Sequence, residues 1–112
     1  MIEDQKNYVK LQDYFMFLCV AAEQWKRMHG LTVSTIYAVE NGLYKLPEGH
    51  TLESVIKFRD SIVIKLEVIM HEYNRVEYYR SHDFGMTELE PSLNREFFDW
   101  FHRKSMLNIT LQ

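Results

Sequence analysis

The sequence predicts a mainly α-helical protein in one compact unit. A helical bundle is expected over residues 1–60, and a long-helix continuation, one short strand and a C-terminal helix over residues 61–112. Apolar residues recur at helical spacing in three long segments. Four glycines and two prolines leave these segments almost uninterrupted. A hydrophobic content of 46% is enough to form a core in a chain of 112 residues.

The first helical segment is expected over residues 5–29. It is long enough for two short helices that bend near Cys19, and it equally fits one continuous helix. In the second case, Gly30 would follow the helix at the C′ position, which favours glycine. The apolar residues at helical spacing are Val9, Tyr14, Phe15, Phe17, Leu18, Ala21, Ala22 and Trp25.

A second, shorter helix is expected between Thr32 and Gly42. Thr32 or Ser34 can cap its start, because a hydroxyl oxygen there accepts a hydrogen bond from a free backbone N–H. Ile36 and Val39 supply its apolar stripe. Gly42 ends the helix, since it adopts the left-handed conformation without steric cost.

A long helix is expected after Thr51, which is a suitable N-cap. Its apolar stripe is long for one small domain and is typical of a helix that packs against a second chain. The stripe consists of Leu52, Val55, Ile56, Ile62, Val63, Leu66, Ile69, Met70 and Tyr73.

The C-terminal part is expected to contain one strand and one helix. The sequence RVEYYR at residues 75–80 favours a short strand that pairs with a symmetry-related copy. Thr87 and Glu90 could form a capping box just before Pro91. The last helix carries Phe97, Phe98, Trp100, Phe101 and Met106.

Residues 30–42 carry the most informative pattern. Ile36 and Val39 would anchor a helix in the core, Glu40 would close its end, and Gly42 would allow a sharp exit. This run resembles the Cro/repressor helix-turn-helix, in which a turn leads into a recognition helix ending in Ile-x-x-aliphatic-Glu-x-Gly. The resemblance implies that the polar face of this helix meets the DNA major groove. The same residues also fit an ordinary helical hairpin with a glycine C-cap.

The rest of the chain extends this resemblance to a subgroup of such regulators, the small dimeric autorepressors encoded beside anti-CRISPR genes. The matching features, in order, are Pro47, the long helix, Arg75–Arg80, and Phe98-Asp99-Trp100 before Ser105-Met106. The resemblance covers residues 11–106. It implies a homodimer whose interface lies in the C-terminal half.

The resemblance implies a homodimeric repressor or autorepressor that occupies a double-stranded DNA operator. Lys26, Arg27 and Lys45 are the candidate cations for phosphates, and Tyr44 could donate its hydroxyl to one. The candidates on the recognition helix are Thr32, Val33, Ser34, Thr35, Tyr37 and Asn41. The family usually carries Arg or Gln where this chain has Ser34 and Tyr37.

The alternative function is a protein-binding antitoxin or inhibitor module on the same scaffold, with a toxin as partner and little DNA binding. The net charge of −3 and the arginine-poor recognition helix favour it. The aromatic tail suits either a partner interface or a dimer core. The expected homodimer interface consists of Val76, Tyr78, Phe98, Trp100 and Phe101.

No pattern predicts an enzyme, a cofactor or a metal site. The five histidines do not pair at i, i+4 with one another or with Cys19. HEPN-type ribonucleases carry an Arg followed, after four to six residues, by a His. This spacing occurs twice, at Arg75 to His82 and at Arg95 to His102, which shows how readily it arises by chance. The polar N-terminus is unlike a signal peptide, and no apolar run approaches the ~20 residues that span a bilayer. A cytoplasmic location is therefore expected.

Overall fold

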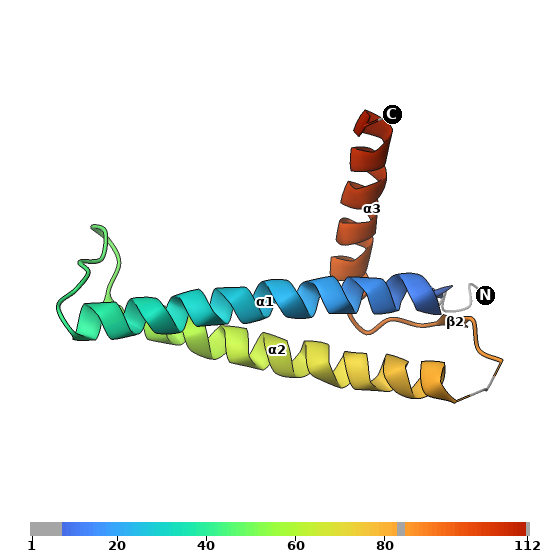
Figure 1. Ribbon diagram of the computed structural model, residues 1–112, viewed down its shortest axis with the longest axis horizontal. Helices are drawn as coiled ribbons and strands as arrows, with labels where there is room; N and C mark the ends of the chain where they lie inside the picture. Colours follow the sequence, from blue (N-terminus) through green and yellow to red (C-terminus); the bar gives the residue numbers. More distant parts are fainter. Residues whose placement is uncertain (1–7, 83–84, 112) are drawn as a thin grey trace, which may run out of the picture. The chain divides into compact units, whose positions relative to one another are not determined.

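The structure is a computed structural model that describes the backbone of residues 8–82 and 85–111 and the side chains of these ranges up to Ser105. Residues 5–7 of the first expected helix and the side chain of Met106 lie outside this part. In order along the chain, the elements are β1 (Val9–Lys10), α1 (Leu11–Glu40), α2 (Leu52–Ser81), β2 (Glu88–Leu89) and α3 (Asn94–Leu111) (Figure 1). The predicted mainly α-helical class is confirmed.

The chain divides into two compact units, and both long helices contribute to each of them. Of the described residues, 8–20, 71–82 and 85–111 form the first, here called the α3 unit. Residues 21–70 form the second, here called the hairpin unit, in which the end of α1 and the start of α2 are joined by the loop 41–51. The boundary expected near residue 60 lies inside the continuous helix α2.

α1 continues through Gly30 without a turn, so the break that the sequence analysis placed before Thr32 is absent. Gly30 is exposed, and nothing lies within 4 Å of the position that a Cβ would take there. A glycine inside a helix lowers its stability by only about 0.5–1 kcal/mol relative to alanine. Thr32 and Ile36 continue the buried side of the helix beyond it. Thr32 is therefore an interior helical residue, and its hydroxyl donates to the carbonyl of Met28 (2.7 Å) instead of capping a helix start.

The end of α1 is the glycine C-cap that the sequence predicts. Gly42 has a φ of +70°. The N–H of Leu43 donates to the carbonyl of Ala38 (2.8 Å), and the N–H of Gly42 donates to that of Val39 (3.2 Å). These two bonds form a Schellman motif, which satisfies carbonyls that the helix end would otherwise leave free.

α2 begins after Thr51, as predicted, and Thr51 and Ser54 cap it reciprocally. The N–H of Ser54 donates to Oγ1 of Thr51 (3.1 Å), and the N–H of Thr51 donates to Oγ of Ser54 (3.2 Å).

The prediction of a strand at residues 75–80 is wrong, because these residues form the last turns of α2. Ile62, Ile69 and Val76 follow one another at a spacing of seven residues and are all buried. The valine thus continues a helical stripe, and this packing outweighs the β preference of valine and tyrosine. The described strands lie elsewhere: β1 and β2 pair antiparallel within the chain, with Val9 opposite Leu89.

The core of the α3 unit is largely aromatic. The ring of Phe97 on α3 lies 5.6 Å from that of Tyr14 and 5.7 Å from that of Phe17, both on α1. Leu89 and Leu93 are buried as well. The predicted C-terminal helix is confirmed, but it begins at Asn94, so the capping box expected at residues 87–90 does not form its start.

Candidate functional site

The hairpin unit exposes many large apolar side chains. Two helices side by side bury only the stripe between them, and in this unit the buried residues are Ala21, Ala22, Thr32, Ile36, Ile62 and Ile69. The exposed large apolar residues are Met28, Leu31, Val33, Tyr37, Leu43, Tyr44, Phe58, Val63, Ile64 and Val68. Single exposed apolar residues are ordinary on a protein surface, so the informative ones are those that lie next to one another.

One groove between the two helices gathers part of this apolar surface. The lining residues are Met28, Leu31, Thr32 and Thr35 from α1, His50 from the loop, and Ser54, Val55 and Phe58 from α2. The groove has a volume of about 540 Å³. Leu31 is 70% exposed and Phe58 is 43% exposed. We call this set of residues the apolar groove.

The hydroxyl groups in the apolar groove are already hydrogen bonded within the chain. Thr32 donates to the carbonyl of Met28 (2.7 Å) and Thr35 to that of Leu31 (2.9 Å). The hydroxyl of Ser54 donates to the carbonyl of Thr51 (2.7 Å). Burial of these residues beneath a partner would leave no hydroxyl donor without an acceptor, so the groove can lose water at little cost.

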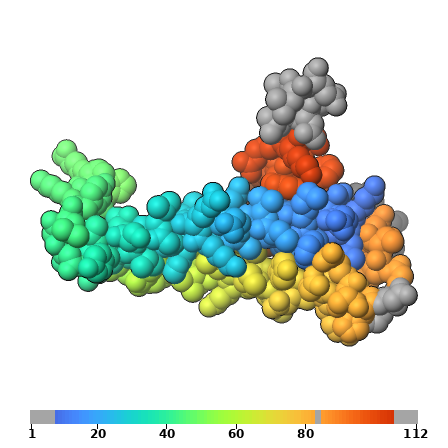
Figure 2. All heavy atoms as spheres, in the orientation of Figure 1, coloured from blue at the N-terminus to red at the C-terminus, as the bar shows by residue number. Residues whose placement is uncertain are grey.

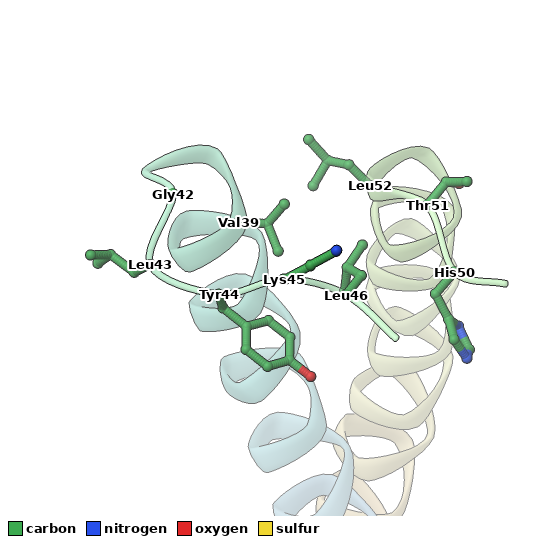
Figure 3. A pocket seen from close by; sticks show the side chains of 9 residues that line it. All are labelled: Val39, Gly42, Leu43, Tyr44, Lys45, Leu46, His50, Thr51 and Leu52. Atoms are coloured by element: carbon green, nitrogen blue, oxygen red, sulfur yellow. The ribbon is translucent and has the colours of Figure 1, made fainter. Parts of the chain in front are cut away.

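A second pocket lies beside the loop 41–51, which projects from the end of the hairpin unit (Figure 2). Val39 and Leu46 point into the space between the two helix ends, and the side chain of Lys45 enters the same space, whereas Leu43 points away (Figure 3). The pocket has a volume of about 520 Å³. It therefore combines apolar walls with one cationic side chain.

The residues expected to bind DNA are divided between the apolar groove, the solvent-facing sides of α1 and the pocket at the loop. Thr32 is buried, Thr35 lines the apolar groove, and the amide of Asn41 donates to the carbonyl of Tyr37 (2.8 Å). Helical spacing places Lys26, Val33 and Tyr37 on one side of α1, and Arg27 and Ser34 on the neighbouring solvent-facing side; Asn41 directly follows the helix. Tyr44 and Lys45 belong to the pocket at the loop.

The charges of the hairpin unit are balanced. The basic residues are Lys26, Arg27, Lys45, Lys57, Arg59 and Lys65, and the acidic ones are Glu23, Glu40, Glu48, Glu53, Asp60 and Glu67, six of each. Arg27, a candidate phosphate contact, forms an ion pair with Glu23 on the same helix, with 3.5 Å between Nε and Oε1. The unit therefore lacks the excess of positive charge that gives most DNA-binding proteins their affinity.

The residues expected at a homodimer interface are only partly available to another chain. Val76 is fully buried in the α3 unit, so this prediction is corrected: Val76 packs within its own chain. Trp100 is partly exposed, and its ring lies 5.7 Å from that of Phe17. Tyr78, Phe98 and Phe101 are exposed by 40–53% and remain candidate contacts.

A buried polar network, which the sequence analysis missed, holds residues 90–93 in the α3 unit. The carboxylate of Glu72 accepts hydrogen bonds from the Tyr14 hydroxyl, from Nε and Nη2 of Arg75 (2.8 and 3.0 Å), and from the N–H of Ser92 (3.0 Å). The N–H of Leu93 donates to the Tyr14 hydroxyl (3.1 Å). The sequence does contain one indication of a buried carboxylate. Glu72 lies three residues after Ile69 and four before Val76, which places it on the apolar side of α2.

The two acidic groups of this network are strongly perturbed. Burial alone would raise the pKa of Glu72, but the hydrogen bonds from Arg75, Tyr14 and Ser92 outweigh it and lower this pKa to about 2. Burial and the hydrogen bond to Glu72 raise the pKa of the Tyr14 hydroxyl well above its ordinary value. Glu72 is buried, and its hydrogen bonds join α1, α2 and the segment before α3, so we interpret the network as structural.

The described residues contain no group of three or more His, Cys, Asp and Glu side chains that could hold a metal ion. Within the same part of the chain, no helix is long and apolar enough to cross a membrane. No protein-family model matches the sequence, and neither a curated protein nor a solved structure is significantly similar to it. The function must therefore be inferred from the surface of the molecule.

Proposed function

We propose that this chain is a protein-binding module whose hairpin unit binds a partner protein through the apolar groove. One observation carries the proposal: Met28, Leu31 and Phe58 stand exposed around a groove whose hydroxyl groups are all hydrogen bonded internally. The lining includes no Asp, Glu, Lys or Arg side chain. Such a surface favours contact with apolar side chains over contact with a phosphate backbone.

The three large side chains supply a useful part of a binding free energy. Met28, Leu31 and Phe58 are 40%, 70% and 43% exposed. Complete burial of a fully exposed side chain of this kind contributes about 2 kcal/mol, so the three together contribute about 3 kcal/mol. The apolar side chains of the partner add a similar amount. An inhibitor or antitoxin role of the kind expected from the sequence falls within this proposal.

DNA binding stays a prediction from the sequence, and three observations weaken its support. α1 has no turn before Thr32, the hydroxyls of Thr32 and Thr35 are bonded within their own helix, and the hairpin unit has no positive excess. The hydroxyls of Thr32 and Thr35 are therefore less available to a base edge, whereas Ser34 and Tyr37 are exposed on the same helix.

The test is affinity capture from the cells in which the gene occurs, with two matched variants of the full chain. Leu31→Asp places a charge in the apolar groove, and Val33→Asp places the same charge on an exposed apolar residue about 200° around the same helix. We expect a stoichiometric protein that survives nuclease and high salt, is lost with Leu31→Asp and is kept with Val33→Asp.

Two results would contradict the proposal. One is equal capture of that protein by both variants, which would place the contact elsewhere. The other is salt-sensitive binding of the chain to duplex DNA, lost in a Lys26→Ala/Arg27→Ala variant, which would instead favour a DNA-binding regulator.

A further inference from the structure

We infer that the apolar groove is occupied by a second copy of this chain, so that two hairpin units associate as a four-helix assembly. The inference rests on the proposed function and names the partner protein. It also moves the homodimer interface away from the segment that the sequence suggested. In the assembly, the same groove residues of each copy would face each other around a two-fold axis.

The first argument is the alternation of large and small side chains along both helices. On α1, Met28 and Leu31 are followed by Thr35, one further turn along. On α2, Phe58 lies between Ser54 and Ser61 on the same side, four residues after one and three before the other. Each large side chain thus neighbours a gap left by a small one. An identical surface, rotated by half a turn, supplies side chains of matching size for these gaps.

The second argument is that the groove does not repel its own copy. Like charges brought face to face at a two-fold interface destabilise it. The groove lining contains no carboxylate, lysine or arginine, and the hairpin unit as a whole carries six charges of each sign. The hydroxyls of Thr32, Thr35 and Ser54 are bonded to backbone carbonyls of their own chain. Two copies could therefore meet without burying a Lys, Arg, Asp or Glu side chain of the lining or an unpaired hydroxyl, and the imidazole of His50 is the lining group that needs a partner or contact with water.

The third argument is the available area. α1 contributes residues 21–40 and α2 residues 52–70 to the hairpin unit. About 20 residues of helix extend over about 30 Å, and two neighbouring helices are about 20 Å wide. The whole face is therefore roughly 600 Å², and the groove residues, which run from Met28 to Thr35 and from His50 to Phe58, occupy one end of it. The dimer must use the whole face to approach the ~800 Å² per partner of a standard stable interface. A hairpin of two helices is also a poor fold by itself, because most helical stability comes from packing of the apolar face.

The first experiment is sedimentation equilibrium of the purified full chain and three variants at micromolar concentration. We expect the wild-type chain to have twice the monomer mass of 13.5 kDa. Leu31→Asp and Phe58→Asp should weaken association by at least ~30-fold, the effect of losing about 2 kcal/mol at the centre of an interface. Val33→Asp should leave the dimer mass unchanged. The far-UV circular dichroism of each variant checks that its helices are intact.

The second experiment avoids a charge in the groove altogether. Thr35→Cys and Ser34→Cys are made separately in a Cys19→Ser background, and a short bis-maleimide is added. Thr35 lines the groove, whereas its neighbour Ser34 lies outside it and is exposed. We expect a covalent dimer from Thr35→Cys and little or none from Ser34→Cys.

Three results would overturn the inference: a monomer at every concentration, a dimer that Val33→Asp disrupts and Leu31→Asp does not, or equal cross-linking at both cysteines. A monomeric wild-type chain that still loses a foreign partner with Leu31→Asp would refute the second copy and support the proposed function. A dimer broken by Leu31→Asp, with no foreign protein captured, would support the second copy and limit the proposed function to self-association.

Discussion

Replacing Glu72 by glutamine is expected to destabilise the α3 unit strongly. Glu72 is 2% exposed, and its carboxylate accepts four hydrogen bonds, two of them from Arg75. Glutamine has nearly the same shape and keeps one acceptor oxygen. The substitution therefore removes the negative charge while leaving the packing close to unchanged, and it leaves the guanidinium of Arg75 without its charged partner.

The magnitude follows from the pKa of Glu72. The folded protein lowers this pKa from 4.5 to about 2. One pKa unit corresponds to 1.36 kcal/mol, so the charged form is favoured in the folded state by about 3 kcal/mol. We expect Glu72→Gln to lower the free energy of unfolding at neutral pH by about 2–4 kcal/mol, a large fraction of the 5–15 kcal/mol of a typical domain.

The pH dependence has a definite sign. Because the folded pKa is the lower one, the contribution of Glu72 is fully present above the unfolded pKa of about 4.5. It is lost as pH falls through the folded pKa of about 2. The stability difference between the wild-type chain and Glu72→Gln should therefore be constant at neutral pH and should shrink steadily below about pH 4.5.

Urea denaturation followed by circular dichroism measures this difference at each pH. The control is Glu77→Gln, on the same helix. Glu77 forms an ion pair with Arg80, and the two side chains are 44% and 35% exposed, so the pair is expected to contribute less than ~0.5 kcal/mol to the free energy of unfolding. Equal losses for the two variants, or a Glu72→Gln difference that does not change between neutral pH and about pH 2, would refute the reasoning.

Two further pairs of substitutions test the fold. Gly42→Ala should destabilise the chain by about 1 kcal/mol, because its φ of +70° is unfavourable for alanine, whereas Gly30→Ala should stabilise it by about 0.5–1 kcal/mol as an exposed residue inside α1. Thermal unfolding measures both, and a destabilising Gly30→Ala would indicate a turn at that residue. Phe97→Ala should lower the free energy of unfolding by about 3–5 kcal/mol, because the Phe97 side chain is 2% exposed and packs among aromatic rings. Phe98→Ala should lower it far less, because Phe98 is 42% exposed. Similar losses for these two variants in urea denaturation would contradict the described core.

The sequence predicted the helix ends better than the helix breaks. Gly42 and Thr51 were correct as C-cap and N-cap because their chemistry is local: a left-handed glycine and a hydroxyl beside free N–H groups. Gly30 was wrongly predicted as a possible helix end, because a glycine by itself does not show whether the following residues continue the helix. Only the packing of Thr32 and Ile36 decided that α1 continues.

The strand expected at residues 75–80 failed for a related reason. Valine and tyrosine favour strands locally, but Val76 lies seven residues after Ile69 on the buried side of a helix. The seven-residue periodicity of Ile62 and Ile69 was the stronger signal, and it continues to Val76.

The candidate site was predicted only in part. The long apolar stripe of α2 suggested contact with a second chain, which stays a prediction; of that stripe, Val55 lines the apolar groove, whereas the groove residue Phe58 was not among the predicted residues. The groove itself could not be predicted, because it depends on the register between α1 and α2. The Glu72 network was not predicted, because a single glutamate in an apolar stripe does not reveal that its carboxylate accepts a hydrogen bond from the distant N–H of Ser92.

The accessibility of Met28 in the assembled protein tests most directly whether the apolar groove is the binding surface. Met28 in the groove, Met16 on α1 and Met86 after α2 are 40%, 40% and 39% exposed in the isolated chain. Peroxide oxidation of each methionine is followed by peptide mass spectrometry, since oxidation rate depends on exposure. An occupied groove predicts that Met28 reacts several-fold more slowly than Met86, and that Leu31→Asp removes this protection. Equal oxidation of Met28 and Met86 in the assembled protein would contradict the account.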